Sequence, residues 1–313
     1  NKNGRLTKVD LGTDNLNGLW QSVIPFDIDG DGDEDYLVGN WGKNSKFKAS
    51  ADAPMVMFYN DFDNNGQTET IVTTAKEGKY YPLMGLDALA SQVVSFRKKY
   101  QNYRDFAGQT IEQILSKEQL ETSTKLEVQT LETGYLRNDD GKFKFVALGR
   151  DFQVAPVLSF CKFDFDNDGD QDLYWFGSTI GRGEGPGGFL FPSAGRMLRG
   201  DGKGNFQDVT VESRLLDIVG VRYDLLGQNF DPKALRIDPI FHENGKGLAH
   251  ADLNNDGYVD LVATNSSGPV YKEFPPIRNH DVIPKPGPIF LWLNGGGSNN
   301  WITFRLHGRM AVD

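Results

Sequence analysis

Short apolar runs, separated by segments rich in glycine, asparagine and aspartate, form the main pattern along the chain. The clearest runs are Val23–Phe26, Tyr36–Val38, Val157–Phe160, Leu173–Phe176 and Leu261–Ala263. Runs of this length with such boundaries are typical of β-strands. Glycine accounts for 36 of 313 residues, which favours an architecture with many turns. The pattern therefore predicts a mainly β protein.

The strand pattern stops between residues 76 and 125. The apolar residues that recur there at helical spacing are Leu86, Leu89, Val93 and Phe96. The sequence from Thr110 to Gln113 also fits a capping box at a helix start. We therefore predict a helical insertion. Its aromatic side chains are interpreted as its contact with the β structure, and a groove for a partner is the alternative. These aromatic residues are Phe96, Tyr100, Tyr103 and Phe106.

Four connecting segments share one pattern, with oxygen-bearing side chains at alternate positions 1, 3, 5, 7 and 9 and glycine at position 6. We name each loop after its first residue. The members are Asp27, Asp29, Asp31, Asp33 and Asp35 in the Asp27 loop; Asp61, Asp63, Asn65, Gln67 and Glu69 in the Asp61 loop; Asp164, Asp166, Asp168, Asp170 and Asp172 in the Asp164 loop; and Asp252, Asn254, Asp256, Tyr258 and Asp260 in the Asp252 loop. Because short apolar runs flank these loops, we predict that each loop is the tip of a β-hairpin.

A hard dication explains the residue types in these loops. Calcium takes roughly 6–8 oxygen ligands, and the side chains at positions 1, 3, 5 and 9 can supply them. Glycine at position 6 permits a sharp turn, and the varied residue at position 7 predicts a backbone carbonyl ligand. Magnesium fits less well, because it demands stricter octahedral geometry. The alternative for one loop is a plain solvated turn, but four copies in the same phase favour an ion.

The details of the loops distinguish the sites from one another and from EF-hands. An EF-hand has glutamate at position 12 and helices on both sides, whereas position 12 is Val38, Val72, Trp175 and Ala263 in these loops. The Asp61 loop has only three carboxylates. We therefore predict three strong calcium sites, in the Asp27, Asp164 and Asp252 loops, and a fourth, weaker site in the Asp61 loop.

The overall composition narrows the classes of partner. The net charge is −10, which disfavours nucleic acid as a partner. Four calcium ions would add +8 and bring this charge to −2. No run approaches the roughly 18 apolar residues of a membrane span, so no span is expected in this chain. Cys161 is the single cysteine, which excludes an internal disulfide.

A second half follows the acidic hairpins, consisting of a strand, a glycine-rich turn and a strand that contains an aromatic residue. These segments are 134–143, 196–206 and, as a variant, 289–301. Repeated four-stranded units are typical of the blades of a β-propeller. Four units are few for a closed ring, so a partial or truncated propeller is the alternative to a closed one.

The acidic hairpins and their aromatic return strands resemble the FG-GAP or VCBS repeats of integrin-α-like propellers. The segment from Gly247 to Gly257, with Asn299 to Gly308, resembles the beginning of an ASPIC/UnbV segment, and Gly78–Leu83 with its following helices resembles bacterial proteins of that group. The resemblance implies calcium-dependent folding and an extracellular or outer-membrane location in a bacterium, secreted or held as a lipoprotein by a lipid anchor upstream of this chain.

The expected organisation follows from these patterns. Residues 1–75 hold the first propeller units, 76–125 the helical insertion, and 126–246 a further unit and a connector; residues 247–313 hold the last unit and the start of the ASPIC/UnbV-like segment. The long segments after the second strand of each hairpin are expected to gather on the face opposite the acidic loops. Function often resides on loops that a rigid scaffold carries, so we expect the partner contact there.

The expected function is that of a calcium-stabilised binding or assembly module at the cell surface, accessory to an outer-membrane complex, with a protein or glycan as its ligand. The alternative is a catalytic propeller that hydrolyses or cleaves polysaccharides. His242 and His250 lack metalloprotease spacing, and Cys161 is interpreted as an inert buried thiol. Four aromatic residues, Trp41, Tyr80, Tyr81 and Trp175, could form a platform for a sugar or peptide, or else pack in the core.

Overall fold

The computed structural model describes residues 4–5, 12–177, 195–213, 215, 245–265, 268–271, 282–285 and 289–298. The chain divides into two compact units. Unit 1 comprises Asn1–Pro25, Asp33–Val157 and Ser178–Pro192, and unit 2 comprises Phe26–Gly32, Leu158–Gly177 and Ser193–Asp313.

The first sheet of unit 1 is a four-stranded antiparallel meander in the order β1-β2-β7-β8. Its strands are β1 (Ser22–Pro25), β2 (Tyr36–Gly39), β7 (Gly134–Asp139) and β8 (Lys142–Ala147). Asp140 and Gly141 join β7 to β8 and both have positive φ, at 53° and 84°. Two successive residues with positive φ form the tight turn that matches the twist of a hairpin. The predicted strand–turn–strand segment 134–143 is therefore confirmed.

The second sheet of unit 1 lies, in sequence, between β2 and β7 and has the order β5-β4-β3-β6. Its strands are β3 (Met55–Asn60), β4 (Glu69–Lys76), β5 (Lys79–Pro82) and β6 (Thr124–Val128). The last of these strands returns beside the first, which is the Greek-key order. The predicted organisation has successive units divided at residues 75 and 125, whereas the pairing of β2 with β7 encloses the second sheet within the first.

Hydrogen bonds join the start of the enclosed segment to its end. The Gly42 N–H donates to the Leu131 carbonyl at 2.8 Å, and the Asn40 side-chain amide donates to the Thr130 carbonyl at 3.2 Å. The Asn40 N–H also donates to the Thr133 hydroxyl at 3.0 Å. Gly42 has a φ of 80°, and a Cβ there would lie 2.8 Å from the Gln153 carbonyl oxygen, so only glycine fits. Gln153 belongs to a short 3-10 helix, Arg150–Gln153.

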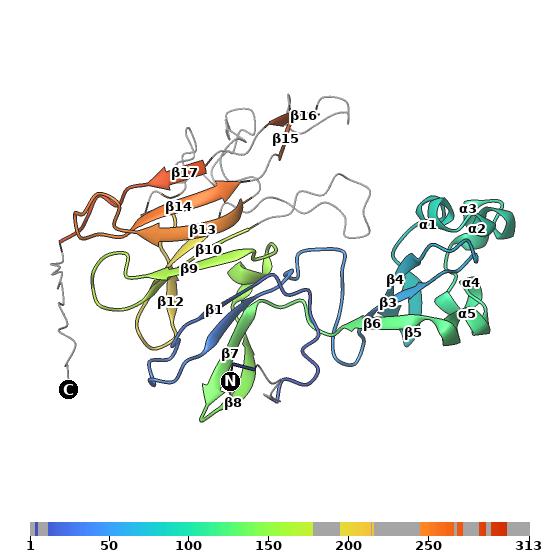
Figure 1. Ribbon diagram of the computed structural model, residues 1–313, viewed down its shortest axis with the longest axis horizontal. Helices are drawn as coiled ribbons and strands as arrows, with labels where there is room; N and C mark the ends of the chain where they lie inside the picture. Colours follow the sequence, from blue (N-terminus) through green and yellow to red (C-terminus); the bar gives the residue numbers. More distant parts are fainter. Residues whose placement is uncertain are drawn as a thin grey trace, which may run out of the picture. The chain divides into compact units, whose positions relative to one another are not determined.

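Five short helices pack on the second sheet of unit 1 (Figure 1). They are α1 (Leu86–Gln92), α2 (Ser95–Lys99), α3 (Tyr103–Phe106), α4 (Ile111–Ile114) and α5 (Lys117–Thr122). The predicted capping box is present, because the Thr110 N–H donates to the Gln113 side chain at 2.8 Å. Helices this short are stable only through tertiary packing. The helical insertion is thus confirmed within the predicted range.

The packing of the helices agrees with the structural interpretation of their aromatic residues. Phe96 and Tyr100 are buried in one core with Phe58 and Ile71 of the sheet, whereas Tyr103 is 60% exposed. At about 25 cal/mol per Å² of apolar surface, a large buried side chain contributes about 2 kcal/mol. Replacing these helices by a flexible linker would therefore uncover the sheet and destabilise it.

The helices lie beside an acidic loop, so their expected place on the opposite face is wrong. The Gln119 side-chain amide donates to the carbonyl of Phe62 at 2.8 Å, within the Asp61 loop. The Thr70 N–H, immediately after that loop, donates to the side chain of Gln92 at 3.3 Å. The reason is β5, which pairs antiparallel with β4 and leads the chain back toward the loop before the helices begin.

Unit 2 contains two sheets packed face to face. One has the order β12-β11-β10-β9, with β9 (Ser159–Phe163), β10 (Asp172–Phe176), β11 (Arg196–Gly200) and β12 (Phe206–Asp208). The other has the order β13-β14-β17, with β13 (Gly245–Ala251), β14 (Asp260–Asn265) and β17 (Ile289–Trp292). Strands β15 (Gly268–Tyr271) and β16 (Val282–Lys285) form a separate pair.

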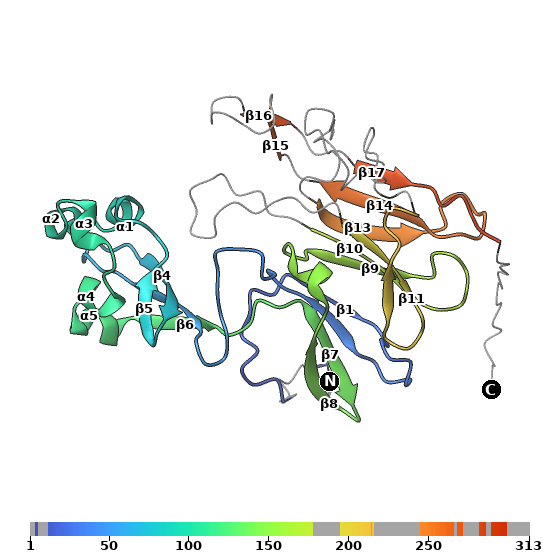
Figure 2. The ribbon, with the colours of Figure 1, turned by 180° about the vertical axis from the view of Figure 1, so that it is seen from behind.

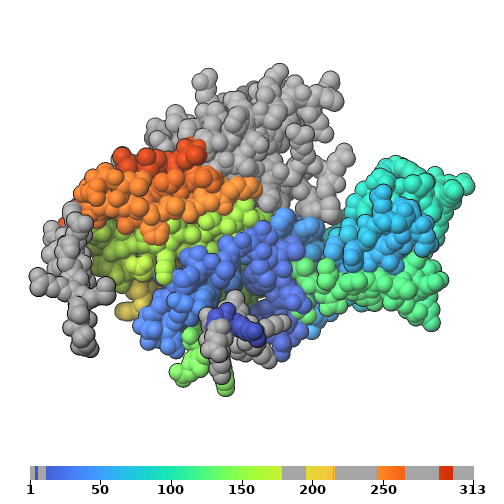
Figure 3. Space-filling model, viewed as in Figure 1, coloured from blue at the N-terminus to red at the C-terminus, as the bar shows by residue number. Residues whose placement is uncertain are grey.

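The two larger sheets of unit 2 share one core. Figures 1 and 2 show β13 and β14 alongside β9 and β10, and Figure 3 shows residues 245–265 in orange against the yellow-green of β9 and β10. Tyr174 and Phe176 are fully buried in this core and pack with Leu261, Ala263 and Phe290. All five residues of β10 are buried. A strand buried on both faces has a continuous apolar sequence, which Leu173–Phe176 shows.

The fold class predicted from the sequence is confirmed at the coarser level. The described part of the chain is mainly β, and each of the two units contains a four-stranded antiparallel sheet. Within the described ranges the sheets form neither a closed barrel nor a closed propeller. The second predicted strand–turn–strand segment is confirmed as β11 and β12. In the third, β17 is present, and residues 299–301 lie outside the described residues.

Candidate metal centres

All four acidic loops are the tips of β-hairpins, as predicted. The Asp27 loop joins β1 to β2, and the Asp61 loop joins β3 to β4. The Asp164 loop joins β9 to β10, and the Asp252 loop joins β13 to β14. In each case the two strands pair antiparallel directly on either side of the loop. The hairpins therefore fix the two ends of every loop close together, so that positions 1 and 9 can meet.

The backbone has the same conformation in all four loops. Glycine at position 6 has positive φ in every case, between 84° and 98°. Position 4 also has positive φ, between 57° and 73°. The residues there are Gly30, Asn64, Asn167 and Asn255. Asparagine and glycine are the residues that adopt this conformation most readily. Position 4 was missed in the sequence analysis, although its restriction to Asn and Gly was a visible signal.

The carboxylate at position 1 holds the turn by accepting backbone hydrogen bonds. In the Asp164 loop, Asp164 accepts from the N–H groups of Asp168 and Gly169 at 3.1 and 3.0 Å. The same bonds form in the Asp61 loop and the Asp252 loop. Asp27 instead accepts from Gly30 and Gly32. Position 1 thus closes the loop whether or not an ion is present.

The carboxylate at position 9 is buried and has a structural role. Asp35, Glu69, Asp172 and Asp260 are each 6% exposed or less. Asp172 accepts from the N–H of Phe165 at 2.6 Å with one oxygen and from Gly200 at 2.9 Å with the other. Asp260 likewise accepts from Leu253 and Asn294. Asp172 therefore connects its loop to the third strand of the sheet, and Asp260 connects its loop to the residues that follow the third strand.

Position 3 supplies the clearest indication that these loops fit a cation. Oδ1 of Asp29 and Oδ1 of Asp63 are buried and accept no hydrogen bond. A buried carboxylate oxygen without a partner costs free energy. A cation bound between positions 1, 3 and 9 would remove that cost. The same position in two separate loops shows this feature, which is difficult to explain for a plain turn.

Positions 1, 3 and 9 converge in three loops. In each, one oxygen from each of the three carboxylates lies within 4.8 Å of the others. The groups are Asp27, Asp29 and Asp35; Asp61, Asp63 and Glu69; and Asp164, Asp166 and Asp172. Such all-oxygen groups are suited to hard dications. Three acidic groups can therefore hold a metal ion, and the Asp61 loop, expected to be the weaker site, is one of them.

The Asp252 loop is built differently at position 3. Asn254 stands there, and its amide donates to Asp256 at 2.8 Å while its oxygen accepts from the Asp256 N–H at 3.0 Å. Among the described residues, this loop does not gather three acidic side chains in the way that the other three do. An amide oxygen can still bind calcium, so this predicted site stays a prediction.

Positions 5 and 7 behave alike in three loops. The side chain at position 5 accepts from the backbone N–H at position 7, as in Asp168 with Asp170 at 2.9 Å. The equivalent bonds involve Asn65 with Gln67 and Asp256 with Tyr258. The Tyr258 hydroxyl donates away from the loop, to the Gly297 carbonyl at 3.2 Å. The side chain of Tyr258 therefore is not a ligand, which leaves its carbonyl for that role. In the Asp27 loop, Asp31 is exposed and Asp33 is half-buried.

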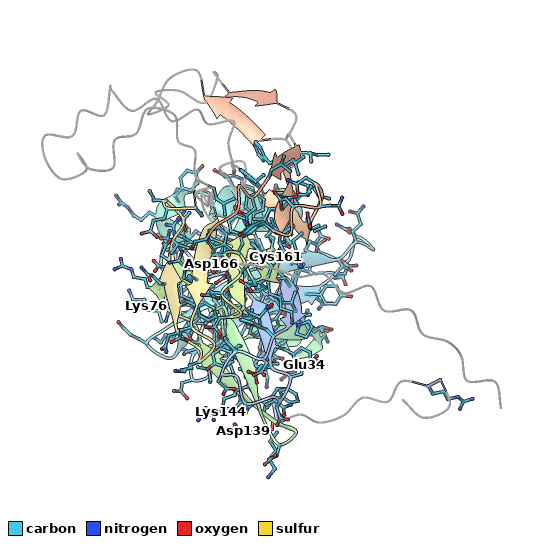
Figure 4. The ribbon with its side chains drawn as sticks, turned by 90° about the vertical axis from the view of Figure 1, so that its left-hand side faces the viewer. Glu34, Lys76, Asp139, Lys144, Cys161 and Asp166 are labelled. Atoms are coloured by element: carbon cyan, nitrogen blue, oxygen red, sulfur yellow. The ribbon has the colours of Figure 1, made fainter. Side chains whose placement is uncertain are left out.

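Burial perturbs the titration of the Asp164 loop. It raises the pKa of Asp172 to about 6, although the N–H groups of Phe165 and Gly200 act in the opposite direction. Burial also raises the pKa of Asp164, and the charge of Asp168 adds to this effect. By contrast, the exposed Asp139, near the tip of the β7–β8 hairpin in Figure 4, has a pKa lowered by its hydrogen bonds from Arg137. Burial thus disfavours the charged form of these carboxyl groups, and a bound cation would offset that cost.

Three of the four aromatic residues considered for a binding platform pack in cores of the protein. Trp175 is fully buried in β10, so it cannot be part of a binding platform. Trp41 packs against Phe47 with ring centroids 5.8 Å apart, in a small core of unit 1. Tyr80 packs against the core formed by the helices. Tyr81 is half-buried.

Cys161 is buried, 4% exposed, and its Sγ lies 2.8 Å from Nδ1 of His250. Burial raises the pKa of the thiol to about 12. Burial and the charge of Lys162 lower the pKa of His250. The imidazole is therefore neutral at physiological pH and provides no positive charge to stabilise a thiolate. The pair joins β9 to β13 and has no sign of an activated nucleophile.

We expect Cys161 to resist thiol reagents in the folded protein. At pH 8 a thiol with this pKa is almost entirely protonated, and its burial blocks access. Labelling with a chromogenic disulfide reagent should reach only a few per cent in an hour, and it should be complete within minutes in denaturant. Labelling of the folded protein at the rate of a free thiol would contradict this expectation.

No protein-family model and no curated protein matches this chain. Among the described residues, none of the helices combines the length and the apolar character needed to cross a bilayer. His242, His280, His307 and the glycine-rich segment 181–188 lie outside the described residues.

Proposed function

We propose that this chain is a calcium-stabilised β module at the bacterial cell surface, of the FG-GAP or VCBS type, that binds a protein or glycan ligand. The observation that carries the calcium proposal is the unpaired position 3 oxygen, repeated in Asp29 and Asp63. In three loops the carboxylate at position 3 lies beside those at positions 1 and 9, so that three similar carboxylate groups form. Calcium is the dication that tolerates such flexible all-oxygen sites best.

A calcium requirement fits the proposed location. Extracellular modules often bind calcium with dissociation constants of about 10⁻⁴–10⁻³ M, which the calcium outside cells can saturate. The propeller arrangement and the assembly role at an outer-membrane complex belong to the same proposal and are supported by the resemblance of the hairpins to those repeats. Capture of partners from solubilised envelopes by the intact tagged protein, with calcium and with chelator, tests this part.

Metal analysis tests the calcium proposal directly. After dialysis against buffer with millimolar calcium, the protein should retain about three calcium ions per chain, one for each acidic group. Asp29→Asn and Asp63→Asn should each weaken one site and lower the amount of calcium that the protein retains, because each change removes the charge of a central carboxylate and leaves an amide oxygen as a weaker ligand. Asp52→Asn is the matched control, since Asp52 is an exposed acid outside the four loops; it should lose none. Protein without bound calcium would show that the loops are plain turns.

A further inference from the structure

One acidic group lies beside a positively charged side chain. Nε of Arg199, on β11, lies 3.0 Å from Oδ2 of Asp166, the position 3 carboxylate of the Asp164 loop. Asp166 is labelled in Figure 4, on the same hairpin as Cys161. The two side chains are 36% and 25% exposed, so solvent only partly screens this pair. Arg199 was not predicted as part of this site, because it lies far from the loop in sequence.

The Asp252 loop of the same unit provides an internal comparison. The N–H of Gly200 donates to Asp172, and the N–H of Asn294 donates to Asp260, at 2.9 and 2.8 Å. The two third strands are therefore in the same register with their loops. Arg199 and Leu293 are the residues before these donors, so they occupy equivalent places. One loop has an arginine there, and the other has an apolar side chain that is 58% exposed.

We propose that Arg199 is an internal counter-ion of the Asp164 loop, which supports the empty loop and lowers its affinity for calcium. This inference rests on the proposed calcium function. Without an ion, the carboxylates at positions 1, 3 and 9 repel one another, and the guanidinium reduces that repulsion. With an ion bound, the same guanidinium repels the dication.

Arg199 also orients Asp166, which favours binding, so the two effects must be weighed. Fixing one short side chain improves affinity only a few-fold, because few rotamers are lost. A unit charge at the distance of a neighbouring side chain repels a dication by an amount that lowers affinity on the order of tenfold, even in a water-like medium. Repulsion is therefore the larger effect. The Asp164 loop fills only at higher calcium concentrations than its five carboxylates would suggest.

Calcium titration by calorimetry of chelator-stripped protein tests this inference. Arg199→Leu, which copies the Asp252 loop, should tighten one site by about tenfold and leave the others unchanged. Arg199→Lys keeps the charge and should stay within about twofold of wild type. Arg196→Leu is the matched control: Arg196 lies on the same strand but pairs with Asp208, outside the loops, and the change should leave every site unaltered. Asp166→Asn combined with Arg199→Leu should abolish the tightened site and so assign it.

The outcomes separate this inference from the proposed function. If wild-type protein binds calcium and Arg199→Leu tightens no site, the role of Arg199 is wrong and the calcium function stands. If wild-type protein binds no calcium, the calcium function fails. The melting temperature in chelator then decides whether Arg199 supports the loop without an ion. Arg199→Leu should lower it by a few degrees more than Arg196→Leu, and equal shifts would overturn the counter-ion role. If Arg199→Leu does not fold, Arg199→Gln removes the same charge and takes its place in every arm.

Discussion

Removal of calcium should lower the melting temperature of this protein by about 10 °C. An ion that binds only the folded state stabilises it by RT ln(1 + [L]/Kd). At about 2 mM free calcium and a dissociation constant of about 10⁻⁴ M, the Asp27 and Asp61 loops each gain about 2 kcal/mol, and the Asp164 loop, with the roughly tenfold weaker affinity that Arg199 imposes, gains about 1 kcal/mol. The three acidic groups together gain about 4–5 kcal/mol. For a chain of this size, each kcal/mol corresponds to about 2 °C.

Differential scanning calorimetry with excess chelator, followed by restored calcium, measures this effect. Asp52→Asn should show the full shift, because this exposed acid lies outside every loop. Asp29→Asn combined with Asp63→Asn should show a much smaller one. Identical melting curves for wild-type protein with calcium and with chelator would rule out a stabilising role for the ion.

Asp172→Ala should destabilise the protein by about 2–4 kcal/mol in chelator, and by more in calcium, where the ion held by the Asp164 loop is lost as well. The change leaves the buried N–H groups of Phe165 and Gly200 without an acceptor. Each such group costs about 1–3 kcal/mol. Removal of a buried charge returns part of this cost, since burial raises the pKa of Asp172 to about 6. Chemical denaturation at neutral pH measures the loss.

Two variants in the same loop separate the structural role from the ligand role. Asp172→Asn keeps one oxygen as an acceptor and should lose about half as much stability. Asp168→Ala alters an exposed position 5 side chain, so its cost in chelator should stay below about 1 kcal/mol. A large effect of Asp172→Ala that disappears in chelator would mean that position 9 acts only through the ion.

The local part of this structure was predictable from the sequence. The hairpins followed from short apolar runs around each loop, and the capping box at Thr110 followed from residue types three positions apart. These features depend on neighbours in sequence. The buried roles of Phe96 and Trp175 also agree with the core interpretation of the aromatic residues.

The non-local part was not predictable in this way. Three carboxylates stand in the Asp61 loop and three in the Asp252 loop, so their number does not explain why Asp61, Asp63 and Glu69 converge. Convergence depends on positions 1, 3 and 9 alone, and the extra acids of the other loops lie further out. The approach of Arg199 to Asp166 is likewise set by strand pairing between distant segments. No single-sequence periodicity contains that information.

Residues 43–129, which lie between β2 and β7 in unit 1, form a segment that can be exchanged as a whole module. Because Asn40 and Gly42 are hydrogen-bonded to Thr130 and Leu131, the β1-β2-β7-β8 meander is closed at the point of insertion. The entropy of loop closure changes only slowly with the length of chain between two such fixed ends. Evolution can therefore lengthen, shorten or replace residues 43–129 while the parent meander keeps its register. An engineer can use the same junction to graft a foreign domain onto this scaffold.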